Sequence, residues 1–167
     1  MKHVRLIAGI SMAAVLLAAA PQPRHIDDFD TSPLDAASIA VLVPTSAPSD
    51  FGDVKITAMS GRPHSSEGGY LIVLGAVTDC EGGTACAYAT VEGEPTRKHA
   101  VPRGYHAVKL HDGSKGYYID GPCGANCSGS FQLVFFRGNA EYMIGIKAGR
   151  LADGLLIERG LRHIQHG

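Results

Sequence analysis

The sequence predicts an α+β domain, in which an antiparallel, curled β-sheet of about seven strands carries a short N-terminal helix and a C-terminal helix packed on one face. Three observations predict this fold. Short runs between residues 53 and 147 alternate apolar and polar side chains or are wholly apolar, and turn residues separate them. Helical spacing of apolar residues returns only after residue 150. The chain also has 21 glycines and no tryptophan among 167 residues, which favours a turn-rich β protein.

The chain begins with a predicted secretory signal at residues 1–20. A basic start precedes the apolar run Leu6–Leu17 and three small alanines, which is the pattern of a cleavable leader. A retained membrane anchor is the alternative, but the run is shorter than the roughly 20 residues that a spanning helix needs. We therefore expect no stable membrane anchor after cleavage. Residues 21–32 are polar and proline-bearing and predict a flexible linker, and residues 33–167 form a single domain.

The short N-terminal helix is predicted to start at Ser32-Pro33. Ser32 is a good N-cap, Pro33 suits the first helical turn, and Asp35 lies near the free amides of that turn. The helix would run to about Leu42 and end before Pro44, because proline disfavours a helical conformation of the preceding residue.

Seven strands are predicted from the patterns that follow. The run YLIVLGAV at 70–77 is apolar on both faces, which is typical of a central strand. Asp112-Gly113-Ser114 and Gly138-Asn139 are signals for tight hairpins. The expected strands are 53–59, 70–77, 85–91, 105–110, 115–120, 131–136 and 141–147.

The C-terminal helix is predicted over 150–165. Ile157, Leu161 and Ile164 fall on one side of such a helix. Gly154 and Gly160 each weaken a helix by about 1 kcal/mol relative to alanine, so packing against the sheet must hold it, and Gly160 is a position where it could end early.

The four cysteines are Cys80, Cys86, Cys123 and Cys127, and all lie in glycine-rich turns between predicted strands. In an oxidising compartment we expect two disulfides. Three connectivities are possible, and we favour Cys80–Cys86 with Cys123–Cys127 because each pair closes its own hairpin end. A four-cysteine zinc site is the alternative, but the spacings are looser than those of usual zinc knuckles.

The two cystine-held loops are the candidate binding loops, because function concentrates on loops that a rigid scaffold positions. Their candidate residues are Glu81, Gly82, Gly83, Thr84, Gly124, Ala125 and Asn126.

Catalytic signatures are sparse. The chain has no Gly-x-Ser-x-Gly elbow and no phosphate-cradling loop. His106 and His111 lie five apart on a predicted strand, so they would point to opposite faces and would not share a metal. Glu92 and Glu94 would point to one face of their strand, which we interpret as the solvated one. We expect no metal and no cofactor.

Charge excludes one class of partner. Lys2 and Arg5 lie in the leader, so the rest of the chain holds 13 of the 15 Lys and Arg residues against all 16 Asp and Glu residues, a net charge of −3 with histidine neutral. A protein of this charge is not expected to bind nucleic acid.

The order of three features carries a family resemblance. Val43-Pro44-Thr45 leads to Phe51-Gly52, the hairpin FQLVFFRGNAEYMIGI follows, and ADGLLIERGLRHI closes the chain. This order resembles a small exported bacterial domain of unknown function that occurs at the ends of anti-sigma-factor-like proteins and sporulation lipoproteins. The resemblance implies a non-enzymatic binding or sensing module. It also implies that six residues are core: Leu133, Phe135, Tyr142, Ile144, Leu155 and Leu161.

Three functions remain open from the sequence. The first is a secreted or periplasmic binding or sensing module of the bacterial cell envelope or medium, whose partner is a protein, glycan or lipid. The second is a small secreted hydrolase with a site around His106, His111 and Asp112. The third is a structural accessory of the envelope.

Overall fold

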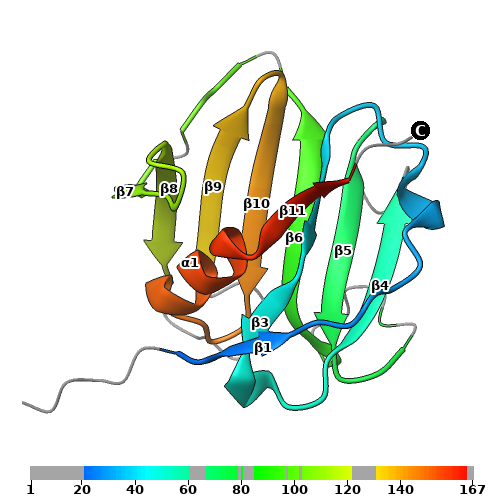
Figure 1. Ribbon diagram of the computed structural model, residues 1–167. Coiled ribbons are helices and arrows are strands. Elements are labelled where there is room, and N and C mark those ends of the chain that lie inside the picture. The colour runs from blue at the N-terminus through cyan, green and yellow to red at the C-terminus, as the bar shows by residue number, and fades with distance from the viewer. Residues whose placement is uncertain are drawn as a thin grey trace, which may run out of the picture.

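The computed structural model describes residues 21–60, 67–78, 80, 85–96, 98–101, 103–121 and 131–164. The regular structure of these residues is mainly antiparallel β-sheet, with one α-helix at residues 151–159 (Figure 1). The elements are β1 (Pro23–His25), the 3₁₀ turn η1 (Ser32–Leu34), β2 (Val41–Pro44), β3 (Ser46–Pro48), the 3₁₀ turn η2 (Ser49–Phe51), β4 (Lys55–Ser60), β5 (Tyr70–Gly75), β6 (Ala87–Pro95), β7 (His106–Lys109), β8 (Lys115–Asp120), β9 (Phe131–Arg137), β10 (Ala140–Ile146), α1 (Leu151–Arg159) and β11 (Leu161–Ile164).

The predicted seven-stranded antiparallel sheet is confirmed. Its order is β4-β5-β6-β10-β9-β8-β7, so β6 pairs with β10 instead of with its successor β7. In the centre of the sheet, Tyr142 of β10 is paired with Gly93 of β6 and with Phe135 of β9. The curl of the sheet stays a prediction.

The hydrophobic core lies on one face of this sheet. In Figure 1, α1, β1, β3 and β11 lie over that face, and β11 forms a two-stranded sheet with β2 while β1 pairs with β3. The helix α1 contacts β9 and β10, and β2 contacts β6. The largest fully buried side chains are Tyr70, Tyr142, Phe131, Phe135, Leu34, Ile72, Leu74, Leu133, Ile144, Ile146, Ile157 and Val41.

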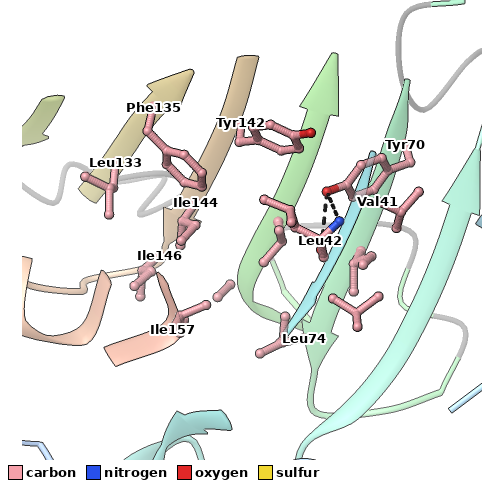
Figure 2. Close-up of a cluster of buried hydrophobic side chains, with 14 of the residues drawn as sticks. Val41, Leu42, Tyr70, Leu74, Leu133, Phe135, Tyr142, Ile144, Ile146 and Ile157 are labelled. Carbon is pink, nitrogen blue, oxygen red and sulfur yellow. Dashed lines mark hydrogen bonds between the residues drawn. The ribbon is translucent and has the colours of Figure 1, made fainter. Parts of the chain in front are cut away.

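Two tyrosines attach the β2 segment to the sheet. The Tyr70 hydroxyl accepts a hydrogen bond from the Leu42 N–H at 2.9 Å and donates to the Leu42 carbonyl at 3.2 Å (Figure 2). The Tyr142 hydroxyl donates to the Ala40 carbonyl at 2.8 Å. Gly93 leaves room for the Tyr70 ring, because a Cβ at Gly93 would lie 2.3 Å from Tyr70 Cε1. The buried main-chain groups of Leu42 and the carbonyl of Ala40 thus obtain partners from tyrosines of the large sheet.

The predicted N-terminal helix is wrong. Only the single turn η1 forms where the cap was expected, and residues 41–44 form β2, which pairs antiparallel with β11. Every residue of β2 is buried. Val41 and Val43 are β-branched, so they suit a strand better than a helix, and their partners lie more than a hundred residues away in the chain.

The predicted C-terminal helix forms, but it is shorter than expected. It ends at Arg159, and Gly160 makes the transition into β11. The Gly160 carbonyl accepts hydrogen bonds from the Thr45 N–H at 2.9 Å and from Thr45 Oγ1 at 2.6 Å. A Cβ at Gly160 would lie 2.1 Å from Ser46 Oγ, so the close approach of these segments requires glycine.

The segment expected to be a linker contains structured residues. Residues 23–25 form β1, and the following Ile26 is buried and donates its N–H to the Thr45 carbonyl at 3.0 Å. The predicted signal at residues 1–20 lies outside the described residues. Within the described part of the chain, no helix has the length and apolar character needed to cross a membrane.

The core expected from the family resemblance is buried to different degrees. Leu133, Phe135, Tyr142 and Ile144 are almost completely buried, whereas Leu155 and Leu161 are half-buried at the margin of the core.

Candidate functional site

The sheet has a second face, opposite the core, which we call the open face. The described 3₁₀ turns, α1 and the small strands contribute their buried side chains to the core on the other side. Side chains alternate along each strand, so one cross-strand row of the open face can be followed through the register. That row is Met59 of β4, Leu71 of β5, Glu92 of β6, Met143 of β10, Val134 of β9 and Tyr117 of β8.

A depression of about 140 Å³ in the open face is lined by Glu92, Glu94, Glu141 and Met143, and we call it the acidic hollow. Glu94 and Glu141 are directly opposite each other on β6 and β10, and Met143 is opposite Glu92. Thr90 precedes Glu92 by two residues on β6, on the same face, and its hydroxyl donates to Glu92 Oε1 at 3.1 Å. The hollow therefore holds three carboxyl groups from two neighbouring strands.

Two carboxyl groups of the acidic hollow, those of Glu92 and Glu141, lie in surroundings that disfavour their charged forms. Burial raises the pKa of Glu92, the neighbouring Glu94 raises it further, and only the Thr90 hydrogen bond lowers it. Burial also raises the pKa of Glu141, Glu94 adds to that rise, and His99 opposes it. Desolvation and like charge both disfavour the ionised forms, so a cationic or hydrogen-bond-donating group placed here would relieve a cost that the free protein carries.

Aromatic side chains lie beside the acidic hollow. The His99 ring stacks on Phe136 of β9 with centroids 4.7 Å apart, and a ring nitrogen of His99 lies 3.1 Å from the Gly138 carbonyl oxygen. The Tyr105 hydroxyl donates to Gln132 Oε1, also on β9. These contacts attach the segments that precede β7 to the sheet and give the open face both aromatic and acidic character.

The predicted disulfide between Cys80 and Cys86 is present. Cys80 is buried and packs with Leu71 and Val73 of β5 in a small cluster that is separate from the main core. Leu71 is in the open-face row, so the disulfide braces one end of that face. The second predicted pair, Cys123 and Cys127, lies outside the described residues. So do the candidate loop residues Glu81, Gly82, Gly83, Thr84, Gly124, Ala125 and Asn126.

The residues of the hydrolase alternative are spread around β7 and the turn that follows it. His106 begins β7, and its ring lies 5.7 Å from the Tyr118 ring. Asp112 lies in the turn and accepts hydrogen bonds from the Ser114 N–H at 2.8 Å and from Arg137 at 3.1 Å. A hydrogen bond from the Ser114 side chain is the main cause that lowers the pKa of Asp112, and the Ser114 N–H bond and the charge of Arg137 contribute. This carboxylate stabilises the turn.

One cleft near His111 contains a buried carboxylate that sequence reasoning did not single out. The cleft has a volume of about 120 Å³ and is lined by Lys109, Leu110, His111, Leu155, Glu158 and Arg159. The side chain of Glu158 is only 2 % exposed and lies 3.5 Å from the Arg137 guanidinium.

Glu158 contacts the main chain of His111 and not its ring. The His111 N–H donates to Glu158 Oε2 at 3.1 Å. No hydroxyl or thiol nucleophile is among the residues that line this cleft. A buried carboxylate paired with an arginine and a main-chain amide is the arrangement expected of an ion pair that attaches α1 to the β7–β8 turn. The geometry thus gives Glu158 a structural role.

Sequence reasoning found part of the open face. The period of two along β6 correctly placed Glu92 and Glu94 on one face of their strand. Glu141, His99 and Tyr105 were missed, because only the register of β10 against β6 and the path of the chain before β7 bring them there. In the described ranges, no group of His, Cys, Asp and Glu side chains has the arrangement of a metal site.

Comparison with protein-family models, with curated proteins and with solved structures finds no match to this chain. The resemblance to the small exported bacterial domain therefore stays a prediction.

Proposed function

We propose that this protein is an exported, non-enzymatic binding module of the bacterial cell envelope or medium, and that its open face receives the partner. One observation carries the proposal. Neighbouring strands of the seven-stranded sheet hold the acidic hollow beside the aromatic side chains of Phe136 and Tyr105, on the face opposite the core.

The chemistry of the acidic hollow suggests the class of partner group. Three half-buried or exposed carboxylates repel anions, so nucleic acid and anionic lipid headgroups are disfavoured. A lysine, an arginine or a hydrogen-bond donor such as a sugar hydroxyl would relieve the repulsion between Glu94 and Glu141. We therefore expect a partner protein or glycan that presents a cationic or donor group to this hollow.

Export is supported by the leader pattern of residues 1–20 and is compatible with the Cys80–Cys86 disulfide, since such bonds persist mainly in oxidising compartments. The N-terminus of the protein recovered from its native cell tests this. Export predicts a chain that begins near residue 21 and lies outside the cytoplasm. A cytosolic protein that begins at Met1 would show that this part of the proposal is wrong.

The binding surface is tested with two matched charge reversals. Glu94→Lys changes the acidic hollow, whereas Asp28→Lys makes the same change at an exposed residue that pairs with Arg162 of β11, away from the open face. Residues 21–167 of each variant and of the wild type are immobilised, and proteins and glycans retained from envelope and culture extracts are quantified. We expect the wild type and Asp28→Lys to retain a partner that Glu94→Lys loses. Equal retention by all three proteins would exclude the open face as the binding surface.

A further inference from the structure

The strand β7 forms one edge of the large sheet. It pairs only with β8 among the described strands, and Figure 1 shows it at the outer side of the sheet, far from β4. The opposite edge differs, because η1 contacts β4 and the Ser60 hydroxyl donates to the Pro33 carbonyl there. An uncovered edge strand presents main-chain donors and acceptors in the spacing that another strand needs.

The register shows which main-chain groups of β7 are available. The Leu110 N–H donates to the Ser114 carbonyl at 2.9 Å, so Leu110 and Ser114 form a hydrogen-bonded pair. Hydrogen-bonded and non-hydrogen-bonded pairs alternate along an antiparallel ladder. Ala107 and Lys109 are consequently the residues of β7 whose N–H and C=O groups point away from β8. Both residues are exposed, and neither has a main-chain partner outside the ladder in the described part of the chain.

The charge around this edge is positive. Lys109 is directly opposite Lys115 across the β7–β8 pair, whereas at the other end Arg103 precedes β7 and Asp120 ends β8. Like charges directly opposite each other are unfavourable, so the free protein again carries a cost that a partner of opposite charge would relieve. The Asp112 and Glu158 carboxylates both pair with the single guanidinium of Arg137, so together these three groups leave one negative charge against the two lysines, and the balance at this edge stays positive.

The same charges decide between two possible occupants. A second copy of this chain that paired β7 against β7 would bring its own Lys109 to the edge and add to the repulsion. Lysine on a short edge strand is a known device against such self-pairing. An acidic extended segment would form the same main-chain hydrogen bonds and neutralise the lysines.

We propose that β7 accepts an extended acidic segment of a partner protein as an eighth strand of the sheet. The main-chain groups of Ala107 and Lys109 provide up to four hydrogen bonds, and Lys109 and Lys115 provide the preference for acidic side chains. This edge is separate from the acidic hollow, which lies on β6 and β10, so either surface can fail its test without the other.

The test uses residues 21–167 and three blocked eight-residue peptides. The first alternates glutamate with valine, the second alternates lysine with valine, and the third is the glutamate peptide N-methylated at alternate residues. The third peptide keeps the charge but lacks the amide hydrogens that pair with β7. Binding is measured by calorimetry, and hydrogen exchange of individual amides is followed by NMR.

We expect the glutamate peptide to bind and to slow the exchange of the Ala107 and Lys109 amides. The other two peptides should bind at least about tenfold more weakly, since each lacks either the charge or the main-chain bonds. Two variants locate the site. Ala107→Pro removes one outward N–H and leaves the hydrogen bonds to β8 in place, and it should lose peptide binding. Exchange of the Val108 amide checks that the pairing with β8 is intact. Lys109→Glu keeps the main chain and should lose the preference for glutamate.

Several results would overturn the proposal. One is binding of the glutamate peptide without slowed exchange at Ala107 and Lys109. Another is equal binding of the N-methylated peptide, which would indicate charge attraction alone. A third is slowing of the same two amides as the protein concentration rises with no peptide present, because that would identify a second copy as the occupant. If Ala107→Pro also loses protection at Val108, the N-methylated peptide and Lys109→Glu decide the question on an intact strand.

Discussion

Gly154→Ala tests the packing of α1 on the sheet, because helix propensity and the structure predict opposite effects. In an exposed helix this substitution raises the free energy of unfolding by about 1 kcal/mol. In this protein Gly154 is buried, and a Cβ there would lie 2.3 Å from Cε1 and 2.6 Å from Cζ of Phe131. Carbon atoms normally approach no closer than about 3.5 Å, so the helix or the ring would have to move by roughly 1 Å.

The Phe131 ring has little freedom to move. Its side chain is fully buried, and it stacks with the Tyr118 ring. Overpacking a well-filled core costs about 1 to 3 kcal/mol. After subtraction of the propensity gain, we expect Gly154→Ala to lower the free energy of unfolding by about 1 kcal/mol. Urea denaturation of residues 21–167 should then show a midpoint lower by about 0.5 M, since domains of this size unfold with a slope of about 2 kcal/mol per molar urea.

A double-mutant cycle isolates the cause. Phe131→Leu removes the two ring atoms that a Cβ at 154 would meet, although it lowers stability in itself. In that background Gly154→Ala should raise the free energy of unfolding by about 1 kcal/mol, so the effect of the alanine changes sign. A stabilising effect of Gly154→Ala in the wild-type background, or the same effect in both backgrounds, would refute the close helix–sheet contact.

Three further predictions address the acidic hollow, the disulfide and the tyrosine anchor. Burial raises the pKa of Glu92 above its unfolded value of 4.5, so the contribution of Glu92 to stability is fully present below pH 4.5 and is lost as the pH rises through the higher folded pKa. The free energy of unfolding, measured from about pH 4 to pH 8, should therefore fall less with rising pH in Glu92→Gln than in the wild type. Parallel curves for the two proteins would contradict this. Replacing Cys80 and Cys86 together by alanine opens a loop with a sequence separation of 6 and should lower the free energy of unfolding by about 2 kcal/mol; wild-type protein in reductant should show a similar loss, and no loss in either case would mean that the bond does not brace the native sheet. Tyr70→Phe leaves the buried N–H and C=O of Leu42 without their hydroxyl partner, so chemical denaturation should show a loss of about 1 to 3 kcal/mol, whereas an unchanged midpoint would show that Leu42 has other partners.

The strands of the large sheet were predictable because their signals are local. The stretch 115–120 matches β8, and the stretches 131–136 and 141–147 match β9 and β10 within one residue at each end. Each pattern needs only the alternation of neighbouring side chains and a turn residue beside it. The Cys80–Cys86 pair was predictable for the same reason, since its two residues close one hairpin end.

The segment 33–44 shows where local signals mislead. A helical turn does begin at Ser32, but its N-cap is Thr31 and not the predicted Ser32, no side chain caps it, and η1 stops at Leu34. The following residues become β2 because β11 pairs with them and Tyr70 satisfies the Leu42 main chain. Neither partner lies within the window in which a cap or a period is recognised, so the β-branched Val41 and Val43 were the only local sign of the strand.

The amino-acid sequence by itself determined which segments form the large sheet, where its tight hairpins turn, and that Glu92 and Glu94 share a face, since these depend on side-chain alternation over a few residues. Only the tertiary structure decided that β10 inserts between β6 and β9, which places Glu141 opposite Glu94 and forms the acidic hollow. It also decided that β7 remains at the edge. Strand order depends on which hydrophobic faces and main-chain groups meet across long loops, and that information is distributed over the whole chain.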